Sequence, residues 1–393
     1  MSDEVVIVSC ARTPIGSFQG ALQSLTAPFL GSIAIRSAVT KVSLEGADID
    51  EVIMGQVLSA GAGQAPARQA SIQSGIPSSV PCTTINKVCG SGLKALMLAR
   101  QSILLGESQI VVAGGMESMS NAPYLLPTAR KGMRMGNQTA VDSMINDGLW
   151  DPYENKHMGS FGDLCASVFK ISRQDQDAFA QQSYAYALEA QKNGYFNDEI
   201  SEVREMINGR EVVLSQDEEP KRYQPEKMLQ LAPVFTQDGT VSAANASKIN
   251  DGAAALVLMS GVEAKRRGLR PLAKILGVSC SAQDPSWFTT APIKAIQQVL
   301  QKVSLTVADI DLFEINEAFA AVPLVAMKEL DISRQKINVY GGAIALGHPI
   351  GASGARVVCT LISAMMQKNV RLGCASLCLG GGEAVAMVIS RAE

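Results

Sequence analysis

The sequence has few histidines, few aromatic residues and no long apolar run. Among its 393 residues only two are histidine, His157 and His348, so any histidine-dependent chemistry must use one or both of them. Aromatic residues make up 5% and charged residues 18%, whereas 47% are hydrophobic and 34 are glycine. This balance is typical of an α/β enzyme rich in small residues, and it argues against a disordered or membrane chain.

Two further absences narrow the classes of partner. The net charge is only −3, which argues against a general nucleic-acid-binding surface. No apolar run approaches the roughly 18 residues that a membrane helix needs. No basic, apolar or arginine-rich leader precedes the strand-like run at residues 5–8. We therefore expect a cytoplasmic protein without a membrane or nucleic-acid partner.

The eight cysteines form no CxxC pair and are too sparse for a disulfide scaffold. The pattern predicts no metal site either. Individual cysteines are therefore candidates for chemistry rather than for structure. They are Cys10, Cys82, Cys89, Cys165, Cys280, Cys359, Cys374 and Cys378.

Buried strands and amphipathic helices alternate in two separate parts of the chain. Such alternation predicts an α/β layered fold, and this length predicts two or three domains. Strands are expected at 5–9, 51–57, 109–113, 253–259, 273–278 and 312–315, and helices at 30–42, 93–105, 292–303 and 355–368. Between these parts, residues 121–249 change character. They carry a basic patch (Arg130, Lys131 and Arg134) and a long helix that Ser172 and Asp175 would cap. We interpret them as an insertion with ligand contacts.

An internal repeat relates the two parts. Ser91-Gly92, a helix, and a strand ending in Gly114–Glu117 resemble Ser353-Gly354, a helix, and a strand ending in Gly380–Glu383. Two related halves could place both helix N-termini at one shared pocket. The alternative is that glycine-rich strand–turn–helix units look alike in any α/β protein.

Cys89 lies in the stretch N-K-V-C-G-S-G (86–92), directly before a predicted helix. Backbone N–H groups of such a turn and the positive end of the helix would point at the sulfur and lower the pKa of the thiol. This predicts a reactive thiol. The alternative is an inert buried cysteine in a tight turn, which is the commoner case.

Three other stretches carry reactive side chains beside glycines. His348 lies between Gly347 and Pro349, where backbone can approach a substrate closely. Cys378 precedes Gly380-Gly381-Gly382, whose N–H groups could hold an oxyanion. Asn316 follows a strand, where its amide could hold a water. Taken singly, each has a structural alternative: a turn histidine, a buried strand cysteine and a helix cap.

Together, the stretches 86–92, 316–319, 341–351 and 378–382 resemble the signature set of the thiolase family. The resemblance extends to V-A-G-G-M-E-S-M-S (112–120), G-Q-A-P-A-R-Q-A (63–70), A-N-A-S (244–247) and N-D-G-A-A-A (250–255). It runs in order along essentially the whole chain and is strongest to the short-chain acetoacetyl-CoA type.

The resemblance implies an α/β fold of two similar halves. Each would be a five-stranded sheet flanked by helices, stacked into a five-layer α-β-α-β-α body, with an inserted loop domain that covers the active site and binds coenzyme A. The implied domains are 1–120 (completed by 250–271), 121–249 and 272–393. Family members are dimers or dimers of dimers, and the segment 121–140 fits an assembly loop, so a homotetramer is expected.

The resemblance also implies acetyl-CoA C-acetyltransferase activity, in which two acetyl-CoA molecules condense reversibly to acetoacetyl-CoA and CoA. Cys89 would carry the acetyl group, His348 would accept its proton, and Cys378 would exchange a proton with the second substrate. Asn316 with its water and His348 would form one oxyanion site, and the N–H groups of Cys89 and Gly380 the other. CoA thioesters are the substrates, and no separate cofactor is expected.

For coenzyme A, the resemblance implies contacts from His157, Met158, Arg222, Phe235, Ser247 and Phe319. Three residues depart from the family pattern: Phe161, Tyr340 and Glu383. Because Phe161 and Tyr340 are expected near the pocket wall, they leave a broader-chain 3-ketoacyl-CoA thiolase as an alternative. From other classes, a Cys–His thioester hydrolase and a non-catalytic CoA-binding scaffold remain open.

Overall fold

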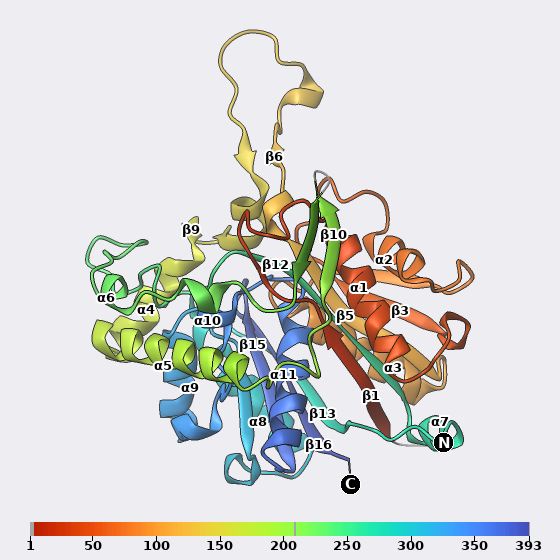
Figure 1. Ribbon diagram of the computed structural model, residues 1–393. Helices are drawn as coiled ribbons and strands as arrows, with labels where there is room; N and C mark the ends of the chain where they lie inside the picture. Colours follow the sequence, from red (N-terminus) through yellow and green to blue (C-terminus); the bar gives the residue numbers. More distant parts are fainter. Residues whose placement is uncertain (1–3, 208–209, 393) are drawn as a thin grey trace.

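Two β-sheets, one from each half of the chain, lie on either side of a central helical layer and join through one short strand pairing in the computed structural model, which describes residues 4–207 and 210–392 (Figure 1). The first sheet has the order β4-β3-β5-β12-β1 and the second β13-β16-β15-β14. The bounds are β1 (Val5–Arg12), β3 (Glu51–Gly55), β4 (Cys82–Ile85), β5 (Ile110–Ser118), β12 (Asn250–Ser260), β13 (Ala273–Ala282), β14 (Leu312–Ile315), β15 (Leu372–Leu379) and β16 (Glu383–Arg391). A short β2 (Gly16–Ser17) pairs with β12.

The two sheets repeat one pairing pattern, as the internal repeat predicts. β3 is parallel to β5, which is antiparallel to β12, which is antiparallel to β1. In the second half, β14 is parallel to β15, which is antiparallel to β16, which is antiparallel to β13. The fifth strand is β4 in the first sheet but only a bridge between Phe313 and Ile337 in the second. The expected pair of five-stranded sheets is therefore complete in the first half only.

Alternating side chains of each strand face different helical layers. In β1, Val5 and Ile7 belong to the core between the sheets, whereas Val6 and Val8 belong to the core on the outer face. The outer layers are α1 (Ala27–Thr40) and α2 (Pro66–Ser74) on the first sheet, and α8 (Ala291–Lys302) and α9 (Ala321–Leu330) on the second. Between the sheets lie α3 (Ser91–Leu105) and α11 (Ser353–Gln367). The result is the expected five-layer α-β-α-β-α body.

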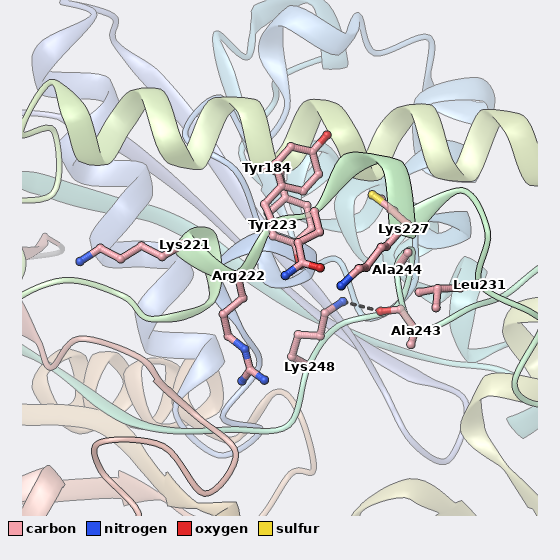
Figure 2. A pocket seen from close by; sticks show the side chains of 11 residues that line it. Tyr184, Lys221, Arg222, Tyr223, Lys227, Leu231, Ala243, Ala244 and Lys248 are labelled. Carbon is pink, nitrogen blue, oxygen red and sulfur yellow. Dashed lines mark hydrogen bonds between the residues drawn. The ribbon is translucent and has the colours of Figure 1, made fainter.

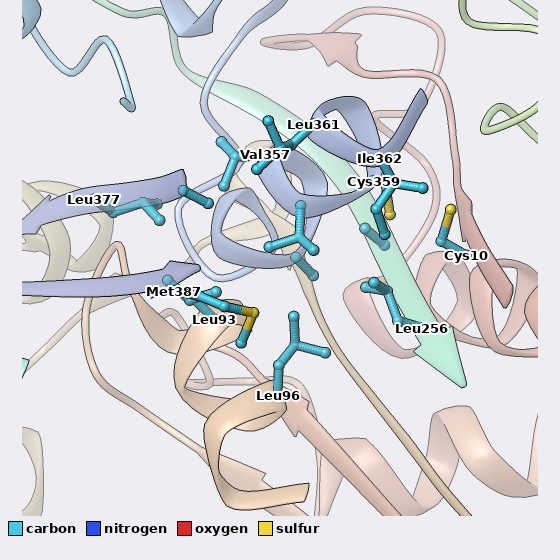
Figure 3. Close-up of a cluster of buried hydrophobic side chains, with 14 of the residues drawn as sticks. Cys10, Leu93, Leu96, Leu256, Val357, Cys359, Leu361, Ile362, Leu377 and Met387 are labelled. Atoms are coloured by element: carbon cyan, nitrogen blue, oxygen red, sulfur yellow. The ribbon is translucent and has the colours of Figure 1, made fainter. Parts of the chain in front are cut away.

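The two central helices approach each other at their N-termini. A Cβ on Gly92 would lie 2.6 Å from the Ala355 nitrogen, and one on Gly354 would lie 2.2 Å from the Leu93 nitrogen, so only glycine fits at either position. Leu93 and Leu96 of α3 and Val357 and Leu361 of α11 continue this contact into the central core (Figure 3). The Ser-Gly turns of the two halves therefore bring both helix N-termini together.

The predicted elements are present, with ends that differ by a few residues. β5 is the clearest difference, since the strand expected at 109–113 continues to Ser118. Its hydrophobic pattern stops at Gly114, but the backbone stays paired with β12, and a Cβ on Gly114 would lie 2.0 Å from the Ala254 oxygen. Close strand pairing therefore requires the glycine that seemed to end the strand.

The insertion covers one side of the two sheets (Figure 1). A hairpin of β6 (Tyr124–Leu125) and β7 (Val141–Asp142) projects away from the body. The other elements are a π-helix (Met144–Leu149), β8 (Trp150–Asp151), β9 (Lys156–His157), α4 (Met158–Val168), α5 (Arg173–Lys192), β10 (Val203–Ile207), β11 (Arg210–Leu214) and α6 (Pro225–Met228). The predicted capping box is confirmed, because the Ser172 and Asp175 side chains each accept the other's backbone N–H.

A buried ionic cluster joins the insertion to the first sheet. Arg12, at the end of β1, lies with its Nε 2.6 Å from Glu199 and its Nη1 2.7 Å from Asp217. Thr360 of α11 donates to the same Glu199 carboxylate. All three charged side chains are fully buried, so removing one partner would leave an uncompensated charge. In the described ranges no helix is both long and apolar enough to cross a membrane.

Candidate active site

Cys89 lies in a tight turn directly before α3, at the level where α3 and α11 meet. The Ser91 hydroxyl accepts from the Lys87 N–H at 2.8 Å and donates to the Val88 carbonyl at 2.7 Å. Val88 has φ 46°, which is an outlier for a β-branched residue. Backbone strain is therefore held at the residue before the candidate nucleophile.

Cys378 and Gly380 come from the end of β15 and the turn to β16. A Cβ on Gly90 would lie 2.4 Å from the Leu379 side chain and one on Gly380 would lie 3.4 Å from Val88, so the two turns lie against each other. The N–H groups of Gly380 and of Cys89 itself lower the pKa of the Cys89 thiol. Cys378 is 1% exposed, and a negative charge on Cys89 would raise its pKa. The structure thus brings a thiol of the first half together with a thiol and a backbone donor of the second half.

His348 lies in a buried loop between α10 (Ala343–Leu346) and α11. Its Nδ1 is 2.7 Å from the Ser353 hydroxyl, which donates to the Pro349 carbonyl at 3.0 Å. The Asn316 amide N–H faces Nε2, which favours the tautomer with the ring proton on Nδ1, donated to the Ser353 oxygen. Nε2 is then left as a proton acceptor.

Asn316 follows β14 and faces that acceptor. Its Nδ2 is 3.4 Å from His348 Nε2, and its backbone N–H donates to the Ser376 carbonyl of β15, two residues before Cys378. The side-chain oxygen is buried and without a hydrogen-bond partner among the described residues. This arrangement leaves a hydrogen-bond acceptor to which a water can donate.

Burial dominates the electrostatics of the site. Desolvation raises the pKa of Cys89 to about 11, although the Gly380 N–H and its own N–H act in the opposite direction. The expected lowering of the pKa of this thiol is therefore wrong for the ligand-free protein. Desolvation also raises the pKa of Cys378 well above its usual range, and it lowers the pKa of His348 to about 3 with help from the Arg356 charge. At neutral pH both cysteines are thiols and the imidazole is neutral.

Aromatic side chains of the insertion pack against Phe319, which belongs to the same buried cluster as Cys378. The His157 ring stacks on Phe235 at 4.6 Å, and Phe235 meets Phe319 edge to face at 6.0 Å. Met158 and Phe161 belong to the same buried cluster as Phe319 and Cys378. The Ser247 N–H donates to the Ala318 carbonyl at 2.9 Å and ties the insertion to the Asn316 segment.

A second part of the site is a cavity of about 490 Å³ between α5 and the segment 221–248 (Figure 2). Arg222 lines it, as do the stacked rings of Tyr184 and Tyr223, whose centroids are 4.6 Å apart. Three lysines complete its positive lining: Lys221, Lys227 and Lys248. Burial lowers the pKa of Lys248 to about 8. Two aromatic rings and four cations suit a nucleotide that carries phosphates.

Family models match almost the whole chain. Residues 5–262 match the thiolase N-terminal domain and residues 269–391 the thiolase C-terminal domain. The chain belongs to the thiolase family.

Individual thiolase relatives are similar over their full length. A probable acetyl-CoA acetyltransferase of Dictyostelium discoideum is 50% identical, covering 99% of this chain and 94% of the relative. A cytosolic acetyl-CoA acetyltransferase of Gibberella zeae is 47% identical, covering 99% and 98%. The crystal structure of the Bacillus anthracis acetyl-CoA acetyltransferase superposes with a TM-score of 0.97 at 41% identity, covering 99% of each chain.

One sequence expectation about this thiolase needs correction. Tyr340 does not lie at the wall beside Cys378. It packs on Tyr195 and Phe196 in the central core and donates to Gln367 at 2.8 Å, because the loop after β14 turns its ring toward α5 and α11. Phe161 belongs to the same buried cluster as Cys378 and packs edge to face on Phe288. Glu383 pairs with Lys87, two residues before Cys89.

Several side chains that shape the site were not identified from the sequence. Ser353 fixes the His348 ring, Asn250 accepts the His348 N–H at 2.8 Å, and Glu117 and Glu317 contact the loop on either side. All four lie in stretches that the sequence singles out, Ser353 in the internal repeat and Asn250, Glu117 and Glu317 in family motifs, but the motifs did not indicate their contacts with the His348 loop. Across residues 4–207 and 210–392 no group of three or more His, Cys, Asp or Glu side chains is suited to hold a metal ion.

The low pKa of His348 predicts acid-sensitive stability. In the unfolded chain this histidine takes up a proton below about pH 6.5, but in the folded protein it does so only near pH 3. The contribution of the neutral His348 to stability is therefore complete above pH 6.5 and declines as the pH falls. From pH 7 to pH 5, the unfolding free energy of the wild type should fall by about 2 kcal/mol more than that of His348→Asn. Urea unfolding at both pH values measures this, and equal losses in the two proteins would contradict a neutral buried His348.

Proposed function

We propose that this thiolase is an acetyl-CoA C-acetyltransferase that condenses two acetyl-CoA molecules reversibly to acetoacetyl-CoA and CoA. The observation that supports the proposal is that charges on Cys89 and Cys378 would interact, while Asn316, which faces His348 Nε2 at 3.4 Å, is bonded through its backbone to Ser376 on the Cys378 strand. Relatives of 47–50% identity that bear this name support it. CoA thioesters are the substrates, and the proposed reaction uses no separate cofactor or metal.

In the first half-reaction, the Cys89 sulfur attacks the carbonyl carbon of acetyl-CoA while its proton passes to His348 Nε2. A carbon–sulfur bond forms to Cys89, and the bond to the CoA sulfur breaks. The departing CoA thiolate takes the proton of Cys378, which is a thiol at rest because burial raises its pKa. The site then holds acetyl-Cys89, a Cys378 thiolate and a His348 imidazolium.

In the second half-reaction, the Cys378 thiolate takes a proton from the methyl group of a second acetyl-CoA. The resulting carbanion attacks the carbonyl of acetyl-Cys89, which forms the new carbon–carbon bond and releases the Cys89 thiolate. That thiolate recovers its proton from His348. Each group thus returns to its starting protonation state, and the reaction can run in either direction.

Two donor sets would stabilise the oxyanions. The Asn316 amide with a water, together with His348, would hold the oxygen of the enolate, and the N–H groups of Cys89 and Gly380 would hold the oxygen on the acetyl group. Removal of one such donor typically costs about 3 kcal/mol of transition-state stabilisation. Burial of His348, Asn316 and Cys378 strengthens these interactions, because the local dielectric constant is lower than that of water.

Coenzyme A would extend from the cation-lined cavity to the cysteines. Arg222 and the neighbouring lysines suit the phosphates. Ser247 and the stacked rings of His157 and Phe235 would contact the pantetheine arm. Met158, Phe161 and Phe319 are at most 8% exposed and belong to the same buried cluster as Cys378. This packing favours acetyl and acetoacetyl groups over long acyl chains.

The two thiols should separate the half-reactions when replaced. Cys89→Ala should abolish acetyl-enzyme formation, because it removes the acceptor of the acetyl group. Cys378→Ala should still form acetyl-Cys89 but lose carbon–carbon bond formation by at least about a thousandfold, as expected for a general acid–base group. Mass spectrometry of the acetylated protein and an acetoacetyl-CoA assay measure the two steps. Near-normal condensation by Cys378→Ala would refute these roles of the two thiols. Net hydrolysis of acetyl-CoA by the wild type, without acetoacetyl-CoA, would indicate a thioester hydrolase instead.

Chain length distinguishes this proposal from a broader 3-ketoacyl-CoA thiolase. The kcat/KM for the four-carbon substrate should exceed that for the ten-carbon substrate by at least about tenfold, because each methylene that does not fit the pocket costs 1–3 kcal/mol. Thiolytic cleavage of both substrates under the same conditions measures the ratio. Comparable values would overturn the short-chain assignment.

We also propose a cytoplasmic homotetramer, a dimer of dimers. The projecting hairpin at 121–142 exposes large apolar side chains, including Tyr124 at 68% and Met135 at 96%, which suits a contact between subunits. Light scattering should give four subunits for the wild type and fewer for a variant that carries Tyr124→Ser and Met135→Ser. An unchanged mass would assign the contact between subunits to another surface.

The cytoplasmic location is tested separately. A fluorescent fusion of the protein found outside the cytoplasm would contradict it.

A further inference from the structure

The loop that carries His348 is completely buried. Every residue from 341 to 350 is buried, and Gly341 and Gly347 have φ values of 78° and 109°. The loop contains only one short helix, so most of its N–H groups must find acceptors outside regular structure. The positions of these acceptors therefore determine the orientation of the His348 imidazole.

Glu317 holds the loop before His348. One carboxylate oxygen accepts from the Ile344 N–H at 3.2 Å and the Ser183 hydroxyl at 2.7 Å, and the other from the Asn338 amide at 2.8 Å. The side chain is fully buried. A Cβ on Gly342 would lie 2.3 Å from its carboxylate carbon, so the loop backbone lies directly against this group.

Glu117 holds the loop after His348, and it does so from the first half of the chain. One oxygen accepts from the Gly351 N–H at 2.9 Å and the Val57 N–H at 3.0 Å, and the other from the Leu58 N–H at 3.2 Å. The side chain is also fully buried. Val57, Leu58 and Ile350 belong to one buried hydrophobic cluster, and Cys89 packs against that cluster. Glu117 therefore connects the surroundings of Cys89 to the loop of His348.

Both carboxylates share an unusual environment. Within the described part of the chain, each accepts three hydrogen bonds, and all of them come from neutral donors. A buried carboxylate is costly unless donors satisfy it, so these three donors are needed to keep each group in place. A neutral amide of the same shape would place an N–H₂ group opposite one of these donors.

We propose that Glu117 and Glu317 are positioning residues that hold His348 from the two halves of the fold, so that Nε2 can take the proton of Cys89. Neither carboxylate touches the substrate. Glu317 fixes the approach of the loop at Ile344, and Glu117 fixes its exit at Gly351. This inference rests on the proposed function, since the proton transfer is the step that requires the alignment.

Glu117→Gln and Glu317→Gln test the proposal in the full-length enzyme. Each should slow acetylation of Cys89 by acetyl-CoA by at least about tenfold, because small misplacements of a catalytic group are costly. The KM for acetyl-CoA should stay within about twofold, because the cation-lined cavity is untouched. Asp50→Asn is the matched control: Asp50 accepts the Gln109 and Ile110 N–H groups at 2.7 and 2.8 Å, at the start of β5. It should leave acetylation unchanged.

Rapid-quench mass spectrometry gives the acetylation rate, and thermal unfolding shows whether each variant is folded. Folded Gln variants with wild-type acetylation rates, or with kcat and KM altered together, would overturn the proposal. If the Gln variants do not fold, Ser183→Ala decides. This substitution removes one hydrogen-bond donor to Glu317. It should slow acetylation of Cys89 by about threefold, as expected for a single lost hydrogen bond. An unchanged acetylation rate would refute the role of Glu317. Failure of the wild type to form acetyl-Cys89 would instead contradict the proposed function.

Discussion

The neutral, buried imidazole of His348 is the group on which the rest of the site depends. The Ser353 hydroxyl holds the ring proton on Nδ1, and burial keeps the second nitrogen free of a proton. Because burial also keeps Cys89 and Cys378 as thiols, neither is reactive until a base accepts a proton. The site therefore works by moving a proton when substrate arrives, and it stores no thiolate beforehand.

This arrangement needs residues from both halves of the fold. Gly92 and Gly354 let the two central helices approach closely, so the turn that carries Cys89 meets the loop that carries His348. The last strands of the second half bring Cys378 and Gly380 to the same point. The cost is a site crowded with buried polar groups, which Glu117, Glu317 and Asn250 satisfy by accepting backbone N–H groups.

Much of the fold could be predicted from the sequence, because runs of buried strand and amphipathic helix are local patterns. The repeat of Ser-Gly turns indicated the two halves, and Ser172 with Asp175 indicated the start of α5. Long-range contacts could not be predicted in this way. The turn chemistry around Cys89 indicated a lowered thiol pKa, but the desolvation that reverses it comes from distant segments. The placement of Tyr340 and the φ of Val88 depend on tertiary packing for the same reason.

The protonation of His348 tests this account most directly, and the chain has only two histidines to distinguish. In ¹⁵N-histidine-labelled protein at pH 7, with His157 assigned by substitution, His348 should show a protonated Nδ1 and an unprotonated Nε2. The signal should keep this form down to pH 5, because burial lowers the pKa of the ring. An imidazolium at pH 7, or a proton on Nε2 in the ligand-free protein, would contradict the role of His348 as the group that accepts the Cys89 proton.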